Sequence, residues 1–286
     1  MPSLIDIRRR IRSVKNTQQI TKAMKMVSAA KLRRAQERAL ASRPYASMLE
    51  RMLCNVAAAA AGNSEIANLP LLQTREEKRI QILVVSSDSG LAGGFNANLF
   101  RTVQDFIAER RGAEIRVEVL GKKGRDFFRR RRRVEITGEH IGVGDKPDYD
   151  RAAEIADKMI DFYANAEIDS VYLAVNEFKS VMAPNLVLRK ILPVDIPEAK
   201  EPVDYIYEQP IEEMLEALLP RYVEIAVYRA MLESNSAFQA SRMTAMDAAS
   251  KNAGDVIQDL TLNLNRVRQA AITREIIEIV SGAAAL

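Results

Sequence analysis

The sequence predicts a mostly helical α+β protein, in which helices from the two chain ends form a long antiparallel coiled coil and an α/β domain lies between them in the chain. Two observations carry this prediction. Long stretches at both ends place apolar residues three and four positions apart, as helices do. The middle instead alternates short β-branched runs with helical patterns. The expected boundaries are 1–60 and 208–286 for the coiled coil, 75–195 for the α/β domain and 196–207 for a connector.

The N-terminal helix is expected to begin near Ser3, because Ser3 followed by Asp6 is similar to a capping box. Pro44 is expected to kink or interrupt it near its second half. Two groups of apolar residues, each spaced four and then three positions apart, are predicted to form one face of this helix. They are Ile7, Ile11 and Val14, then Ile20, Met24 and Val27. Such a face requires a partner helix.

The C-terminal helix is expected to start after Pro210 and to be interrupted and restarted at Pro220. From Pro220 to Ser281 no proline follows, and a single helix there would be about 90 Å long. The predicted seam reads Met246, Ala249, Ala253, Val256, Leu260, Leu264, Val267 and Ala271. This period is near 3.5 and implies a left-handed supercoil. So long a helix does not fit inside a compact globule, and the N-terminal helix is its expected partner.

The central part of the chain predicts a mostly parallel sheet with helices on its faces. The expected strands are Arg79–Ser87, Glu114–Gly121, Asp169–Phe178 and Asn185–Val194. The expected helices are Asn96–Arg110 and Tyr149–Ala164. Strands that alternate with helices in this way are typical of a Rossmann-like layer.

Composition and charge narrow the possible classes of protein. A single cysteine, Cys54, excludes an internal disulfide framework. No stretch approaches the roughly 20 consecutive apolar residues of a membrane span, so any membrane contact is expected through partners. Residues 1–56 carry 13 Lys and Arg against 3 Asp and Glu, a basic arm that we expect to face an acidic protein surface.

One turn is similar to a phosphate-binding loop, since Ser86–Asn96 follows a strand and opens a helix. Its glycines, Gly90, Gly93 and Gly94, match neither a dinucleotide fingerprint nor a P-loop. We interpret it as a tight strand-to-helix turn, with a nucleotide-binding enzyme as the rival hypothesis. His140 is the only histidine and is expected at the surface. No catalytic residue, metal site or cofactor is predicted.

The arginine run Arg129–Arg133 leaves its role open between a solvated face and a partner-docking surface. Together with the basic N-terminal helix it also raises a second rival hypothesis, a coiled-coil protein that binds nucleic acid. Aromatic residues are not interleaved with these arginines beyond Phe127 and Phe128, which speaks against base stacking.

Five segments, together with the tail Asn265–Leu286, carry a resemblance to a known family over essentially the whole chain. They are Ile20–Val27 (ITKAMKMV), Ser42–Ala46 (SRPYA), Leu83–Asn96 (LVVSSDSGLAGGFN), Arg221–Glu224 (RYVE), Ser241–Ala253 (SRMTAMDAASKNA) and the tail. In these segments the chain resembles the γ subunit of the bacterial F-type ATP synthase.

The resemblance implies a central-stalk rotor that does no chemistry itself. The coiled coil would turn inside a hexamer of α and β subunits, while the ε subunit and the membrane c-ring bind at its base. Torque would pass between the proton-driven ring and the β catalytic sites, and the subunit would regulate ATPase activity and proton flow. The expected location is the cytoplasmic face of the bacterial plasma membrane.

The resemblance also implies roles for particular residues. Met24 and Arg242 match positions that approach the acidic lever of β. Gln269, Thr273, Glu278 and Val280 match tail positions tied to coupling and to the bearing in the hexamer. Tyr205 and Glu208 match the foot that contacts the c-ring.

Overall fold

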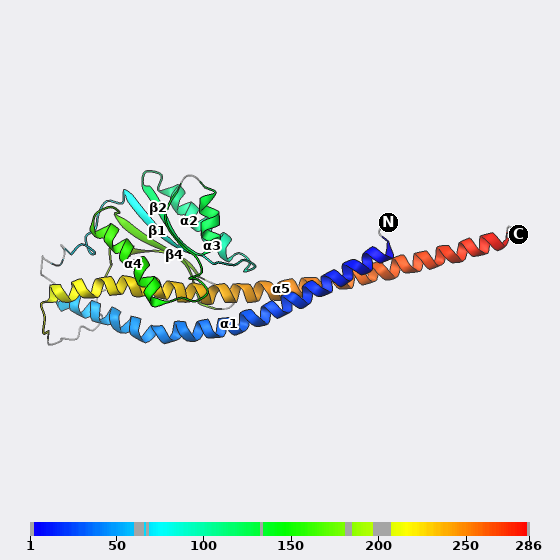
Figure 1. The fold of residues 1–286 in the computed structure, drawn as a ribbon, viewed down its shortest axis with the longest axis horizontal. Coiled ribbons are helices and arrows are strands. Elements are labelled where there is room, and N and C mark those ends of the chain that lie inside the picture. The colour runs from blue at the N-terminus through cyan, green and yellow to red at the C-terminus, as the bar shows by residue number, and fades with distance from the viewer. Residues whose placement is uncertain are drawn as a thin grey trace. The chain divides into compact units, whose positions relative to one another are not determined.

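Five helices and five strands make up the part of the chain that the computed structural model describes, which is residues 3–59, 66, 69–131, 134–180, 185–196 and 207–284. In chain order they are α1 (Leu4–Ala59), β1 (Arg79–Val85), α2 (Phe95–Glu109), β2 (Glu114–Leu120), α3 (Lys122–Arg129), β3 (Glu135–His140), α4 (Tyr149–Ala164), β4 (Ser170–Glu177), β5 (Asn185–Leu192) and α5 (Ile211–Ala284) (Figure 1). The chain divides into two compact units. One is Met1–Ala29 with Arg242–Leu286, and the other is Ala30–Ser241. Long terminal helices and a central α/β layer confirm the predicted fold class.

The sheet of the second unit has the strand order β3-β2-β1-β4-β5. All neighbouring strands run parallel except β4 and β5, which are antiparallel. This is the mostly parallel sheet that the sequence predicts. Strand β3 and helix α3 were not expected, because β3 has one large apolar side chain, Ile136, and most of its side chains are only half-buried at the sheet edge.

The two faces of the sheet are covered by different helices, since alternate side chains of β1 point to opposite sides. Ile80, Ile82 and Val84 pack with apolar side chains of α2 and α3. Leu83 and Val85 pack with α4 and with the first part of α5. The C-terminal part of α1 joins this core through Leu53 and Val56. In a separate small cluster, Ala46 and Leu49 of α1 contact Ile225 of α5.

The two long helices continue through their prolines, so the predicted interruption at Pro220 is wrong and Pro44 does not interrupt α1. A proline inside a helix removes one backbone hydrogen bond and costs about 3 kcal/mol or more. Buried neighbours offset that cost here: Leu219 and Val223 flank Pro220 in the core, while Ala46 and Leu49 follow Pro44. Tertiary packing therefore outweighs the local preference for a break.

Candidate functional site

In the unit formed by the two chain ends, α1 and α5 run antiparallel, and the side of α1 that faces α5 differs from the predicted one. Thr21 and Ser28 are buried, 9% and 2% exposed, whereas Ile20 and Val27 are 59% and 57% exposed. The predicted second face of Ile20, Met24 and Val27 is therefore wrong for Ile20 and Val27, while Met24 is half-buried. Small hydroxyl side chains fit a close helix contact, and the larger apolar side chains point away from it.

The seam of α5 follows the prediction at Met246 and Ala253, which are buried. It departs at Val256, which is 45% exposed, because Ile257 takes the inward position. The half-buried positions then continue at Leu260, Leu264, Val267 and Ala271 as expected. The seam thus keeps its alternation of three and four residues with one position shifted.

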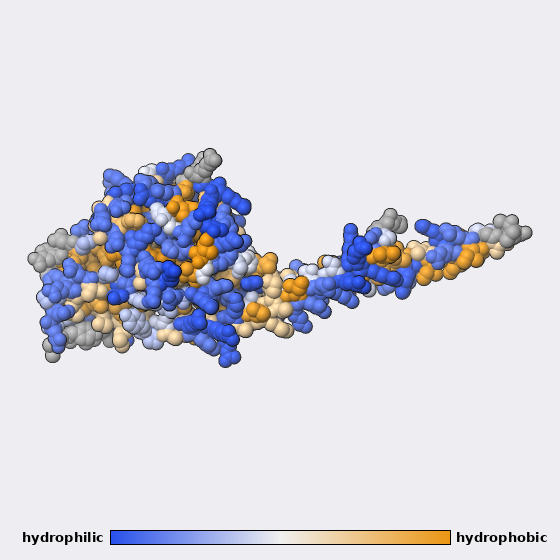
Figure 2. All heavy atoms as spheres, in the orientation of Figure 1, coloured by the Kyte–Doolittle hydropathy of each residue, from blue (hydrophilic) through white to orange (hydrophobic). Residues whose placement is uncertain are grey.

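The exterior of this helix pair carries many large apolar side chains. On α1 they are Ile5, Ile20, Met26 and Val27, and on α5 they are Val256, Leu262, Ile272, Ile276, Ile277, Ile279 and Val280. Figure 2 shows orange, hydrophobic spheres gathered along the C-terminal end of α5. Contiguous exposed apolar surface of this kind marks a protein–protein contact rather than a solvated helix. The outside of the shaft is therefore the candidate functional surface.

The two residues predicted to couple the shaft to β, Met24 and Arg242, lie on different helices of this unit and are both half-buried. The ion pair between Lys25 and Asp247 shows that these two residues lie at the same height along the helix pair. Arg242 precedes Asp247 by five residues, so it lies about 8 Å along α5 from that level. Its Nε is buried without a hydrogen-bond partner among the described residues.

The predicted tail residues Gln269, Thr273, Glu278 and Val280 are all exposed. The Thr273 hydroxyl donates to the Gln269 carbonyl at 2.9 Å, so these two lie one turn apart on one side of α5. The register of Lys25 with Asp247 puts Gln269 level with Ser3, next to the start of α1. The other three residues lie beyond that start, where α5 extends alone (Figure 1).

Of the predicted foot, Glu208 is exposed and Tyr205 lies outside the described residues. Of the arginine run, Arg132 and Arg133 also lie outside them. Arg129 makes two hydrogen bonds to Glu139, at 2.7 and 2.6 Å. The guanidinium of Arg131 lies 4.1 Å from the centre of the Phe127 ring. Two of these arginines therefore have partners within the domain.

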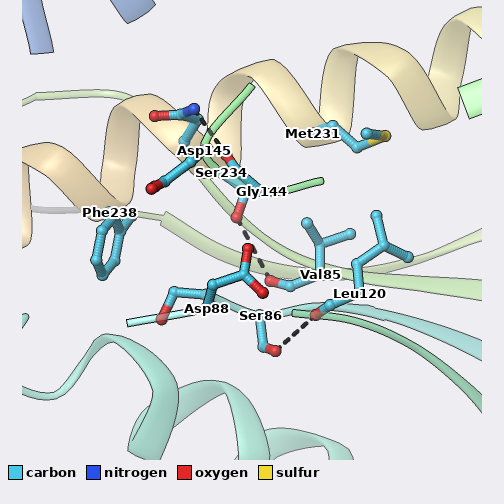
Figure 3. Close-up of a pocket in the computed structure, with 11 residues that line it drawn as sticks. Val85, Ser86, Asp88, Leu120, Gly144, Asp145, Met231, Ser234 and Phe238 are labelled. Carbon is cyan, nitrogen blue, oxygen red and sulfur yellow. Dashed lines mark hydrogen bonds between the residues drawn. The ribbon is translucent and has the colours of Figure 1, made fainter. Parts of the chain in front are cut away.

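The carboxyl ends of β1 and β2, where Rossmann-like sheets bind nucleotides, are covered by α5. Met231, Ser234 and Phe238 of α5 line a small pocket there together with Val85 and Leu120 (Figure 3). Ser234 Oγ donates to the Val85 carbonyl at 3.4 Å, and Asn235 Nδ2 donates to the Gly144 carbonyl at 2.7 Å. The crevice that a nucleotide would occupy is thus filled by a helix of the same chain.

The glycine-containing turn uses its polar groups internally. Asn96 Oδ1 accepts from the Ser87 amide at 3.1 Å, and Asn96 Nδ2 donates to Ser87 Oγ at 2.8 Å. Asp88 Oδ1 accepts from the Lys122 and Gly142 amides, both at 3.0 Å. Groups that would cradle a phosphate hold the turn together instead, which supports the tight-turn interpretation.

Phe238→Ala is expected to lower the free energy of unfolding by about 3–5 kcal/mol, the usual cost of emptying a buried aromatic site. Phe238 is buried and its ring meets Phe95 edge-on at 5.5 Å. Chemical denaturation of the purified chain measures the change. Leu262→Ala is the matched control, because Leu262 is exposed and its loss should stay within about 0.5 kcal/mol. Equal effects of the two variants would contradict the packing described here.

His140, which the sequence predicts at the surface, is half-buried and has a partner. Its Nε2 lies 2.8 Å from Glu118 Oε1, and Glu118 is fully buried in the sheet. Lys158 of α4 approaches the same carboxylate at 3.3 Å, and Gln81 donates to its other oxygen at 3.3 Å. The cluster ties β1, β2, β3 and α4 together. Its members are spread over 78 positions of the sequence, so no local pattern signals it.

Two further observations bound the chemistry of the described part of the chain. No three His, Cys, Asp or Glu side chains there are grouped so as to hold a metal ion. Nor does any helix there have an apolar stretch long enough to cross a membrane. A paired-helix shaft with an apolar exterior, joined in sequence to an α/β layer whose ligand crevice is filled, defines a shaft subunit with a surface for contact with other chains.

Comparison with known proteins specifies the class further. The family model described as ATP synthase matches residues 3–286. The ATP synthase gamma chain of Solibacter usitatus (strain Ellin6076) is 58% identical over 285 residues, which cover 100% of this chain and 99% of that one. The gamma chain of Desulfitobacterium hafniense (strain DSM 10664 / DCB-2) is 48% identical over 286 residues, covering 100% of both. The chain therefore belongs to the ATP synthase γ-chain family and is a central-stalk subunit of that complex, not its catalytic subunit.

Solved structures show the same architecture. A chain of the Tetrahymena thermophila mitochondrial ATP synthase central stalk and c-ring matches with a TM-score of 0.58 and 26% identity, over 81% of this chain and 99% of that one. A chain of the Euglena gracilis mitochondrial ATP synthase rotor, in rotational state 1, matches with a TM-score of 0.66 over 94% and 98%. At 17% identity, the second match shows the shared fold.

Proposed function

We propose that this chain is the rotor of a proton-translocating ATP synthase, which turns inside a hexamer of three α and three β subunits and passes torque between the c-ring and the catalytic β subunits. The observation that carries the proposal is that α1 turns apolar side chains outward and polar ones toward α5. Ile20 and Val27 are exposed, whereas Thr21 and Ser28 are buried. Apolar side chains on the outside of a two-helix shaft need a surrounding protein surface. Apolar contacts without directional bonds also let that surface move past the shaft.

For the coupling to β, we propose that Met24 and Arg242 approach the acidic lever of β from the two helices. The support is their position on one unit, at levels about 9 Å apart. Gln269, Thr273, Glu278 and Val280 would form the bearing at the far end, which is favoured by their exposure and by the place of the last three on the unpaired end of α5. The basic start of α1 suits an acidic sleeve.

At the base, we propose that the ε subunit and the c-ring bind, with Tyr205 and Glu208 contacting the ring. The support is the Tetrahymena relative, which is a chain of a central stalk and c-ring. The functional parts would be the shaft 1–60 and 208–286, the α/β domain 75–195 and the connector 196–207. Because the similar gamma chains are bacterial, the proposed location is the cytoplasmic face of the plasma membrane.

Reconstitution tests this function. The chain, tagged and expressed with and without α and β subunits, is purified through its tag and assayed for ATPase activity. The proposal expects a stable complex with three α and three β per tagged chain, and no ATPase activity from the chain alone. A chain that binds neither α nor β would contradict it.

The rival nucleotide-binding enzyme is tested separately. Calorimetry of the isolated chain with ATP, ADP and NAD is expected to give no binding, because α5 fills the crevice at the ends of β1 and β2. Binding at micromolar affinity, or unaided hydrolysis of ATP, would support the enzyme instead.

A further inference from the structure

A polar stretch interrupts the otherwise apolar seam of α1. Of the five buried or half-buried positions from 18 to 28, four have polar side chains, Gln18, Thr21, Lys25 and Ser28, and the fifth is Met24. Before them the seam is apolar, with Ile7 buried. Opposite them, α5 presents Asp247, Ser250 and Gly254. The stretch lies beside Met24 on the shaft.

Two side-chain bonds cross between the helices in this stretch. Gln18 Nε2 donates to the Ser250 carbonyl at 3.2 Å. Lys25 Nζ donates to Asp247 Oδ1 at 2.5 Å. Gln18 and Lys25 are seven residues apart, one heptad, so both point at α5 from the same side of α1.

The carboxylate of Asp247 is shared by two lysines. Its second oxygen, Oδ2, lies 3.1 Å from Lys251 Nζ, one turn along α5. The hydrogen bonds from Lys25 and then from Lys251 lower the pKa of Asp247 below its usual range. The carboxylate is therefore charged at neutral pH, and the bond to Lys25 is an ion pair.

Gly254 leaves the room that Gln18 uses. A Cβ at position 254 would lie 3.2 Å from Gln18 Nε2, closer than ordinary van der Waals contact. The side chain of Gln18 therefore crosses α5 where α5 has no side chain of its own.

Small side chains such as Thr21, Ser28 and Ala253 interlock weakly, so packing alone defines the register of two helices poorly. In coiled coils, a few polar side chains at seam positions specify the register at some cost in stability. Half-exposed ion pairs add little to stability, typically less than about 1 kcal/mol. Lys25 and Asp247 are such a pair, with side chains 43% and 32% exposed.

We propose that Lys25, Asp247 and Lys251, together with the bond from Gln18 to Ser250, form a register lock that fixes the axial and angular position of α1 against α5 in the shaft. The lock holds Met24 at a set angle to the α5 surface, so that torque turns the two helices as one body. Lys25 and Asp247 are positioning residues in this scheme. The link to torque rests on the proposed rotor function, whereas the lock itself is a property of the isolated chain.

Spin-label distance measurements on the isolated chain test the lock without any partner. Labels are placed at Arg9→Cys and Asn263→Cys, two exposed positions that the register brings to the same level, in a Cys54→Ser background. Lys25→Asp and Asp247→Lys each remove the ion pair and should broaden or shift the distance distribution. Lys25→Gln is included in case a charge reversal prevents folding. It removes the positive charge without placing two carboxylates together, and it should also broaden or shift the distance distribution.

Charge reversal of the whole triad is the decisive variant. Lys25→Asp with Asp247→Lys and Lys251→Asp rebuilds the same pattern with opposite signs and should restore the parent distance. The matched control is Lys15→Asp, which makes the same charge change at an exposed position outside the lock and should leave the distance unchanged. A distance unaffected by Lys25→Asp, Lys25→Gln and Asp247→Lys, or not restored by the triple variant, would overturn the lock.

The same variants in the assembled complex test the link to torque. Proton pumping per ATP hydrolysed should fall severalfold in the single charge reversals and recover in the triple variant. If distances shift and recover while pumping per ATP stays normal throughout, the lock stands and its role in torque is rejected. If the distances shift in the single variants and recover in the triple variant, but the chain assembles with no α or β subunit, the rotor function is rejected. The register lock itself would still stand.

Discussion

Met24→Lys is expected to uncouple ATP hydrolysis from proton pumping while leaving the shaft folded. Met24 is half-buried at the side of the helix pair, beside the outward residues Ile20 and Val27. A lysine there would place a cation against the acidic lever of β that we propose it meets. An ion pair in a partly desolvated contact holds one rotary position more tightly than the others, since breaking it leaves a charge unpaired.

The measurement is proton pumping by inverted membrane vesicles, divided by the rate of ATP hydrolysis in the same vesicles. The ratio should fall severalfold for Met24→Lys and stay near that of the parent for Met24→Leu, which keeps the size and polarity. A normal ratio in Met24→Lys would show that Met24 does not face the lever.

Truncation after Arg268 is expected to weaken the contact with the hexamer and to leave the fold intact. Of the removed residues whose side chains are described, none is buried and only Ala271 is half-buried, so little packing within the chain is lost. Five exposed apolar side chains go with them, Ile272, Ile276, Ile277, Ile279 and Val280. Full burial of each such side chain is worth about 1.5–3 kcal/mol, so losing them should weaken assembly at least about tenfold.

Two measurements separate these effects. Thermal unfolding of the isolated truncated chain should stay within a few degrees of the parent. Dissociation of the complex on dilution should occur at higher concentration. The comparison variant is Gln269→Ala with Thr273→Ala, which shortens two polar side chains and keeps the apolar end. A truncated chain that fails to fold would mean that the tail is structural.

Regular patterns with a buried face were predicted well from the sequence. Helix α4 has the predicted bounds, Tyr149–Ala164, because its apolar residues keep a helical period and pack into the core. Strand β1 was predicted because nearly all of its side chains are buried and β-branched or aliphatic. Strand β3 and helix α3 were missed because polar and charged side chains dominate both segments.

The candidate surface could be predicted only in part. On α1, the sets Ile20, Met24, Val27 and Thr21, Lys25, Ser28 share one spacing and differ by a single residue. Spacing alone does not choose between them, and polarity favours the wrong one. The usual preference assumes that a chain buries its apolar side chains in itself. In a family whose members assemble into a central stalk, that assumption fails at the contact with other chains.

Observation of rotation shows whether this chain turns as a rotor inside the complex. The complex is fixed through its α and β subunits, and a probe is attached at Asp105→Cys, an exposed position of α2, in a Cys54→Ser background. With ATP, the probe is expected to turn stepwise in one direction and to stop when ATP is withdrawn. Hydrolysis of ATP by the same complexes with a stationary probe would contradict the proposed rotor function.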